Sequence, residues 1–259
     1  HMNIAASLQV VFEDVVFEQL NYLYDKYKID NLCMAGGCAF NSVLNGKIKK
    51  RTGFKDIYIH SNAGDAGGAL GAALIASSEN DQNFKNVNIS TSSFGNSYSS
   101  EDIEKNVVSN FVKNKLFNFD KFGDEDELLD VVSEGLIKGK TIAWFSGRSE
   151  WGPRALGNRS ILANPATPNI QNILNLQIKN REQFIPFTPI FMEDKIKDFF
   201  NLDEKIPFMN FVFNVEKNIE KVKGAVHADN SSRIQTINKH QNERIYNLLN
   251  KFYLKSYIP

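Results

Sequence analysis

Apolar residues recur at helical spacing along the first stretch of the chain, from Ile4 to Tyr27. Leucines and valines form one face of this stretch, and acidic residues at the intervening positions form the other face. This pattern predicts a single amphipathic helix. The next run, NLCMAGG (31–37), is short, apolar and closed by paired glycines, so it predicts a buried strand that enters a tight turn. AFNSVLNGKIKKR (39–51) returns to a helical pattern.

The same order then repeats. DIYIHS (56–61) predicts a second strand, and the Ala, Gly and Leu content of NAGDAGGALGAALIAS (62–77) predicts a closely packed helix. Two units of strand, glycine turn and helix favour a layered α/β lobe. Residues 79–100 are rich in Ser, Asn and Asp and show little periodicity, which predicts a linker. We therefore expect one domain over residues 3–95 and a second over 96–259.

The second half alternates between the two periodicities. The pattern predicts, in order, a helix at 125–140 closed by Gly139, a strand at 141–147, a helix at 168–178, a strand at 184–192, a short acidic-flanked helix, a strand at 209–215, and a final helix from Asn242 to about Leu254. The segment SSRIQTI (231–237) stands between the last strand and the last helix without a strand assignment. The fold class predicted from the pattern is mixed α/β.

Charge and cysteine content narrow the partners and the compartment. Lys plus Arg and Asp plus Glu both total 30, so no overall basic field favours nucleic acid or an anionic membrane surface. Cys33 and Cys38 fit neither a disulfide framework nor a metal-finger spacing, and we expect a reducing cytoplasm. The pattern also favours neither secretion nor membrane spanning. A binding site for an anion would therefore depend on a local group of cations and not on the overall charge of the chain.

A cluster of cations supplies the strongest candidate for such a site. WGPRALGNRSILANP (151–165) crowds arginines among glycines and prolines, where a packed core gains nothing from them. Arginine is suited to a bidentate grip on phosphate or carboxylate. The alternative is internal salt bridges to Glu150, Glu182 and Asp229, which we expect for about half of the cations. The cations in question are Arg148, Arg154, Arg159, Lys179, Arg181 and Arg233.

The two glycine turns are ambiguous on their own. The turn at Gly36 and Gly37 could bring backbone N–H groups to a phosphate at a helix N-terminus, or it could be a plain turn. Asp65 in the second turn could bind a metal, but a helix N-cap is the reading that spacing favours. A metal would need further ligands, and the histidines show no paired spacing.

Six motifs together resemble one family. AGGCAFN, NAGDAGGALGAAL, GRSEWGPRALGNRSILANP, LNLQIKNREQFIPFTP, PFMNFVFNV and HADNSSRIQTI occur in the order found in the nodulation-factor and antibiotic O-carbamoyltransferases, and the likeness runs from about Ile4 to Pro259. The resemblance implies a partial actin/Hsp70-like (ASKHA) lobe followed by a YrdC-like α/β domain. It also implies a reaction in which carbamoyl phosphate and ATP give a carbamoyl-adenylate, whose carbamoyl group passes to a hydroxyl of a sugar or other natural product.

The resemblance assigns roles to individual residues. Arg148, Arg154, Arg181 and Arg233 match the catalytic arginines that would hold carbamoyl phosphate and the adenylate phosphate. The resemblance makes Asp65 a ligand of a divalent metal, iron or alternatively magnesium, which reverses the preference for a cap. Gly36 and Gly37 match the nucleotide-phosphate loop. Residues expected to complete cofactor binding are Asn41, Gly67, Gly68, Arg159 and Lys179.

The chain also departs from the family pattern. Ile185 stands where an arginine is usual, and Asn230 replaces a usual glycine. Family chains are about twice as long, so we expect a fragment that binds ATP, AMP or carbamoyl phosphate but does not complete transfer by itself. Two other functions stay open, a non-catalytic nucleotide- or anion-binding module and an ASKHA-type sugar kinase. A homodimer is a further possible assembly.

Overall fold

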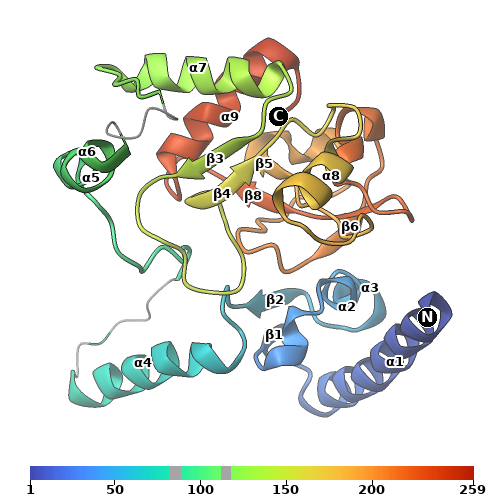
Figure 1. Cartoon of the computed structure of the whole chain (residues 1–259). Coiled ribbons are helices and arrows are strands. Elements are labelled where there is room, and N and C mark those ends of the chain that lie inside the picture. Colours follow the sequence, from blue (N-terminus) through green and yellow to red (C-terminus); the bar gives the residue numbers. More distant parts are fainter. Residues whose placement is uncertain (82–83, 85–88, 112–117) are drawn as a thin grey trace.

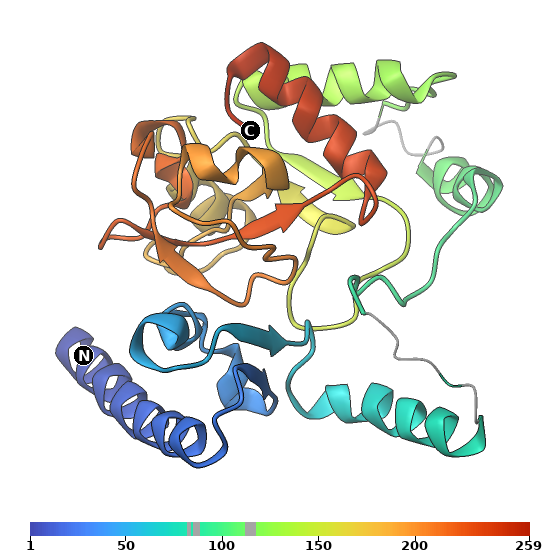
Figure 2. The same cartoon turned by 180° about the vertical axis from the view of Figure 1, so that it is seen from behind.

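A computed structural model describes residues 1–81, 84, 89–111 and 118–259. It is a mixed α/β structure, as the pattern predicts; the ASKHA and YrdC-like assignments stay predictions. Residues 1–81 form a first lobe that lies beneath a larger second lobe, residues 118–259, in both views (Figures 1 and 2). None of the helices in the described part of the chain is long and apolar enough to cross a membrane.

The first lobe has a parallel strand pair at its centre. Strands β1 (Asn31–Met34) and β2 (Asp56–Ile59) pair in register from Asn31 with Asp56 to Met34 with Ile59. The helices are α1 (Met2–Tyr27), α2 (Ser42–Asn45), α3 (Ile48–Arg51) and α4 (Gly68–Asn80). Its core unites side chains from α1, α2 and α3 with one that follows them, namely Phe17, Leu20, Leu44, Ile48 and Phe54.

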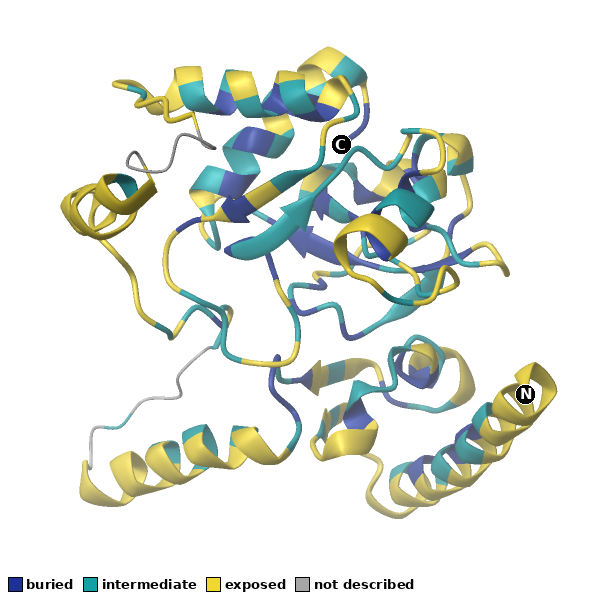
Figure 3. Cartoon of the chain, viewed as in Figure 1, coloured by how far each residue is buried: buried dark blue, intermediate teal, exposed yellow. Residues whose placement is uncertain are grey.

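Helix α1 is confirmed, but the face expected to be buried is partly wrong. Phe17 and Leu20 pack into the core, whereas Leu8 and Val11 are exposed. Figure 3 shows the buried stripe of α1 on a helix that is otherwise largely exposed. Glu13, expected on the solvated face, is instead buried on the same stripe as Phe17 and Leu20. Its carboxylate pairs with Lys47 Nζ at 2.7 Å. The helix therefore turns its Glu13 side inward because a cation on the neighbouring segment neutralises that charge.

The helix predicted over residues 39–51 is broken into two. Helices α2 and α3 are separated at Gly46, which lies against the second lobe. A Cβ at this position would lie 1.9 Å from the carbonyl oxygen of Val212. Glycine therefore allows the backbones of the two lobes to touch here.

The second lobe contains three strand pairs. Antiparallel pairs form between β3 (Ile142–Phe145) and β4 (Arg159–Leu162) and between β6 (Val212–Asn214) and β7 (Ser231–Arg233), and a parallel pair between β5 (Ile190–Met192) and β8 (Gln235–Ile237). The α-helices of this lobe are α7 (Glu125–Ile137), α8 (Ile170–Asn172) and α9 (Glu243–Ser256). A π-helical turn, Ile173–Ile178, continues α8, and the 3-10 turns are Glu193–Asp198, Ile219–Lys221 and Lys223–Ala225. In the sequence, α5 (Ser100–Ile103), a π-helical turn (Glu104–Val108) and α6 (Ser109–Phe111) lie between the two lobes.

Several strand boundaries differ from the prediction. Strand β4 was not predicted, and SSRIQTI is divided between β7 and β8, which pair with different strands. The strand predicted over 184–192 is reduced to β5, because Pro186 and Pro189 lack the backbone N–H that a ladder requires. Most of the other predicted elements are confirmed, including Asn242 as the N-cap of α9.

The segment predicted as a linker is tied to the second lobe where the structure describes it. Trp151 N donates to Ser92 O at 2.7 Å, and Gly95 N donates to Ser149 O at 2.9 Å. The lobes also meet through Asn210, whose Nδ2 donates to Ile59 O at 2.9 Å. Residues 82–83 and 85–88 of the predicted linker lie outside the described residues.

Candidate anion-binding site

Glu150 organises the arginine-containing loop between β3 and β4. Its Oε1 atom accepts the backbone N–H groups of Leu156 and Asn158, both at 2.7 Å, and that of Arg159 at 3.3 Å. Gly152 and Gly157 adopt positive φ angles of 139° and 107°, which are accessible mainly to glycine. The loop is thus folded around a carboxylate that bonds backbone groups.

Arg154 projects from this loop to the junction of the lobes. Its Nη2 donates to Phe40 O at 3.1 Å and its Nη1 donates to Met209 O, while the guanidinium lies 5.8 Å from the centre of the Phe40 ring. Burial, with a further contribution from the charge of Arg233, lowers the pKa of Arg154 to about 10. Arg154 is therefore a half-buried cation beside a second cation.

Arg233 and Arg181 are the other two cations of the group that includes Arg154. Arg233, on β7, donates its Nε to Thr188 Oγ1 at 2.9 Å, and its pKa is lowered by burial and then by the charge of Arg181. Arg181 donates its Nε to Asn175 Oδ1 at 2.7 Å and lies 4.8 Å from the Phe187 ring centre. Arg233 is thus near enough to both Arg154 and Arg181, which lie on separate segments, for their charges to interact, and we call the three residues the arginine trio.

Within the described residues, none of the six predicted cations forms an ion pair. The expectation that salt bridges account for about half of them is therefore wrong. Glu150 bonds backbone groups, and Asp229 accepts from Ser231 N and Oγ at 3.0 and 2.6 Å. Two of the three candidate acids are engaged elsewhere, and Glu182 forms no ion pair with these cations in the described part of the chain, so the trio keeps its positive charge.

The remaining three cations have other surroundings. Arg159 donates to Ser146 O at 2.8 Å and Gly147 O at 3.1 Å and lies 3.5 Å from the Phe145 ring centre, which leaves few donors for a ligand. Arg148 donates its Nε to Gly95 O at 2.8 Å and lines a separate polar cleft between the N-terminal ends of α7 and α9. Lys179 is exposed at the end of a π-helical turn.

The glycine turns lie side by side at the carboxyl ends of β1 and β2. Gly36, with φ of 96°, donates its N–H to Ala63 O at 2.7 Å. A side chain at Gly36, Gly37 or Gly68 would meet nothing within 4 Å, so these backbones can be approached by a ligand. At Gly67 a Cβ would lie 2.2 Å from Asn62 O, which makes this glycine a packing requirement.

The side chain of Asn41 has a structural role. Its Oδ1 accepts from Leu44 N at 3.0 Å and caps α2, and its Nδ2 donates to Gln9 Oε1 at 2.8 Å. These bonds join the first glycine turn to α1. A role for Asn41 in cofactor binding stays a prediction, and it would have to compete with these contacts.

Asp65 begins a 3-10 turn, Asp65–Gly67, and is exposed. Gly64 occupies the N-cap position and no side-chain cap bond forms, so the cap interpretation gains no support. The described residues also contain no group of three or more His, Cys, Asp or Glu side chains placed to hold a metal. Metal binding by Asp65 stays a prediction.

Sequence reasoning missed the neutral and weakly basic neighbours of the trio. Besides Asn175 and Thr188, His227 lies here, with its Nδ1 2.9 Å from Ser231 Oγ. Burial lowers the pKa of His227, Asp229 opposes this effect, and Arg233 adds to it. A signal was available for His227, because HADNSSR places it six residues before Arg233 on the approach to β7.

Comparisons with known proteins agree across most of the chain. A family model described as carbamoyltransferase N-terminus matches residues 1–74, and one described as carbamoyltransferase C-terminus matches residues 133–259. The arginine trio and its neighbours lie within the second match, and both glycine turns lie within the first.

Individual relatives extend over nearly the whole chain. An uncharacterized protein of Synechocystis is 39% identical over 276 residues, covering 97% of this chain and 44% of that protein. Nodulation protein NolO of Bradyrhizobium diazoefficiens and nodulation protein NolNO of Sinorhizobium fredii are each 35% identical over 266 residues, covering 100% of this chain and 47% and 38% of theirs. The chain thus spans less than half the length of these relatives. The matched family models and these relatives together place the chain in the carbamoyltransferase family.

Proposed function

We propose that this chain supplies the donor-activating half of a carbamoyltransferase. The arginine trio binds carbamoyl phosphate and then the phosphate of a carbamoyl-adenylate. In this reaction water displaces inorganic phosphate from carbamoyl phosphate to give carbamate, and a carbamate oxygen then attacks the α-phosphorus of ATP and displaces pyrophosphate. The supporting observation is the convergence of Arg154, Arg181 and Arg233 without a carboxylate partner among the described residues. Like charges gathered in this way are stabilised by a bound anion.

The trio would act electrostatically on the reaction. Charge develops and moves on phosphoryl oxygens during phosphoryl and nucleotidyl transfer, and preorganised guanidiniums stabilise that charge without reorganising. Arg181 and Arg233 are held by neutral side chains, and Arg154 is held by two backbone carbonyls. In each case the protein fixes the position of the cation without cancelling its charge.

The first lobe would serve the later transfer step. Its open turns at Gly36, Gly37 and Gly68 suit the approach of a nucleotide phosphate, and Asp65 offers one oxygen ligand to a divalent cation. A single carboxylate is an incomplete site, so no step is routed through a metal. The acceptor is a hydroxyl-bearing molecule, a sugar or another natural product.

The test is carbamoyl-phosphate-dependent release of pyrophosphate from ATP, followed by AMP as the carbamoyl-adenylate is hydrolysed. We expect the activity to fall by about 100-fold or more in Arg233→Ala, the size of effect seen when one oxyanion donor is removed. The control is Arg51→Ala, because Arg51 is a first-lobe arginine whose partners are Asp14 and Glu13. Activity that survives in Arg233→Ala would overturn the assignment of the trio. Nucleotide binding with no turnover would instead favour a non-catalytic module.

A further inference from the structure

Two guanidiniums of the trio are gripped at the same atom by neutral oxygens. Asn175 Oδ1 accepts from Arg181 Nε at 2.7 Å, and Thr188 Oγ1 accepts from Arg233 Nε at 2.9 Å. A guanidinium carries five N–H donors in a rigid plane, so fixing the Nε–H also fixes the direction of the terminal Nη groups. Within the described residues, neither Arg181 nor Arg233 donates a hydrogen bond through an Nη group.

Asn175 is itself locked in place. Its side chain is completely buried, and its Nδ2 donates to Gln183 O at 3.0 Å and Ile185 O at 2.9 Å. The amide cannot rotate without breaking both bonds, so its Oδ1 stays directed at Arg181. The backbone N–H of Arg181 also donates to Asn175 O at 3.0 Å. Asn175 therefore sets both the backbone and the side chain of Arg181.

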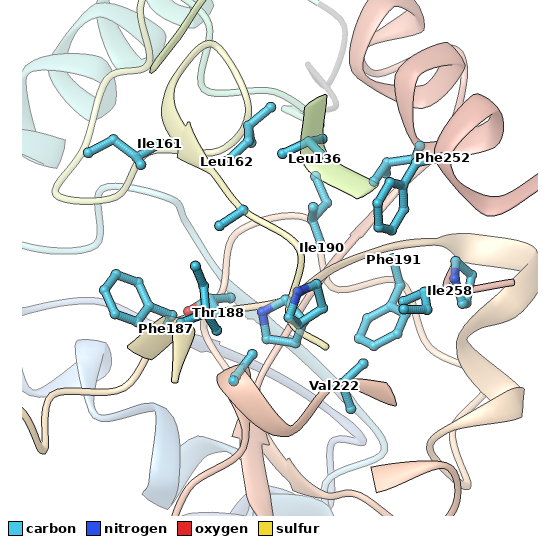
Figure 4. A pocket seen from close by; sticks show the side chains of 18 of the residues that line it. Leu136, Ile161, Leu162, Phe187, Thr188, Ile190, Phe191, Val222, Phe252 and Ile258 are labelled. Atoms are coloured by element: carbon cyan, nitrogen blue, oxygen red, sulfur yellow. The ribbon is translucent and has the colours of Figure 1, made fainter. Parts of the chain in front are cut away.

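Thr188 supports Arg233 from an apolar wall. It lies between Phe187 and Pro189 and borders a cavity of about 140 Å³ between β4 and β5 (Figure 4). Among the described residues that line this cavity, Thr188 carries the sole polar side chain. The apolar lining offers its hydroxyl no other polar side chain on the cavity side, so the bond to Arg233 is a strong constraint.

We propose that Asn175 and Thr188 are positioning residues that direct Arg181 and Arg233 toward one phosphoryl or acyl-phosphate anion. This proposal rests on the proposed function. Neutral acceptors are essential to it, because a carboxylate at either position would pair with the arginine and compete with the ligand. An amide and a hydroxyl orient the guanidiniums and leave their charge intact.

Isothermal titration of the full chain with inorganic phosphate tests the proposal. Thr188→Val removes the acceptor and keeps the branched shape, and we expect phosphate affinity to fall about tenfold, whereas Thr188→Ser, which keeps the hydroxyl, retains affinity. In an Arg233→Ala background, Thr188→Val should cause no further loss, because the two residues act through one interaction. Asn175→Ala and Arg181→Ala should form a second cycle of the same kind.

The outcomes separate the two claims. Wild-type affinity in Thr188→Val, together with a loss in Arg233→Ala, overturns the positioning role while the anion site stands. Absence of phosphate binding by the wild-type chain, or equal binding by Arg233→Ala, overturns the proposed function itself. If Asn175→Ala does not fold, the Nε–H signals of Arg181 and Arg233 are measured by NMR in the wild type. Slow exchange of both supports the proposal, and rapid exchange of both contradicts it.

Discussion

The guanidinium of Arg154 lies close enough to that of Arg233 to feel its charge. Burial and this second charge lower the pKa of Arg154 to about 10. Arg233 is affected in turn by burial and by Arg181. The described residues offer no carboxylate partner to this series of cations, so their mutual repulsion opposes folding and a bound anion offsets it.

Phosphate should therefore stabilise the protein specifically. At a phosphate concentration of about 100 times its Kd, the free energy of unfolding should rise by about 2.7 kcal/mol. Thermal unfolding in phosphate and in chloride at equal ionic strength measures this effect. Arg181→Gln should lose most of the difference and Arg51→Ala should keep it. An equal gain in both variants would mean that phosphate acts away from the trio.

Substitution of Glu150 should weaken the loop that carries Arg154. Glu150→Ala leaves the backbone N–H groups of Leu156 and Asn158 without their acceptor, at a cost of about 2–4 kcal/mol in the free energy of unfolding. Glu150→Gln keeps a neutral acceptor and should cost less. Urea denaturation of the wild type, Glu150→Ala and Glu150→Gln ranks their free energies of unfolding. A Gln variant as unstable as the Ala variant would contradict the hydrogen-bond explanation.

Two glycine substitutions should have opposite effects. Gly46→Ala places a Cβ 1.9 Å from Val212 O, so we expect it to separate the lobes locally and to destabilise by about 1–3 kcal/mol. Gly71→Ala on α4 meets nothing within 4 Å and should stabilise by up to about 1 kcal/mol through helix propensity. Thermal unfolding shows whether each substitution stabilises or destabilises the protein. Limited proteolysis shows whether the contact between the lobes is weakened. Equal effects at the two positions would show that the contact with Val212 is unimportant.

Acidification should destabilise the protein through two histidines. The pKa of His60 is lowered by burial, and that of His227 by burial and by Arg233 against the opposing charge of Asp229. Because the unfolded value is 6.5, the neutral histidines contribute full stability above that pH. This contribution is lost as the pH falls from the unfolded value toward the lower folded values.

Melting temperatures between pH 8 and pH 5 measure this loss. The double variant His60→Gln/His227→Gln should lose less stability over the interval than the wild type, because neither glutamine gains a proton. Both histidines bury an Nε2 atom that has no hydrogen-bond partner among the described residues. A pH profile unchanged by the double substitution would assign the acid sensitivity to other groups.

Sequence patterns predicted the regular elements better than the strand pairings. Helices α7 and α9 follow from periodicity and capping residues, and β1 and β2 from apolar runs closed by glycine turns. Strand β4 escaped because RSIL has no marked alternation and its pairing with β3 depends on a loop held by Glu150. Such a pairing is a tertiary property, and local propensity carries little information about it.

The candidate site shows the same division. The arginines could be selected from their residue type and neighbours, but those features alone could not separate Arg233, which joins the trio, from Arg159, whose donors are bound to backbone carbonyls. Asn175 and Thr188 had no signal, since a neutral side chain acquires its role only from what it touches. Gly46 likewise looked like a helix residue until Val212 was placed beside it.

The carboxylate of Glu150 is an internal anion within the arginine-containing loop between β3 and β4. The backbone N–H groups that a phosphate-binding loop commonly offers to its ligand are already satisfied here by one internal carboxylate. These three N–H groups are therefore not free for a bound anion, and we expect the side chains of the arginine trio to carry its recognition. Such side chains can be substituted one at a time without rebuilding the loop. Selectivity among anions can therefore change by substitution around an unaltered backbone.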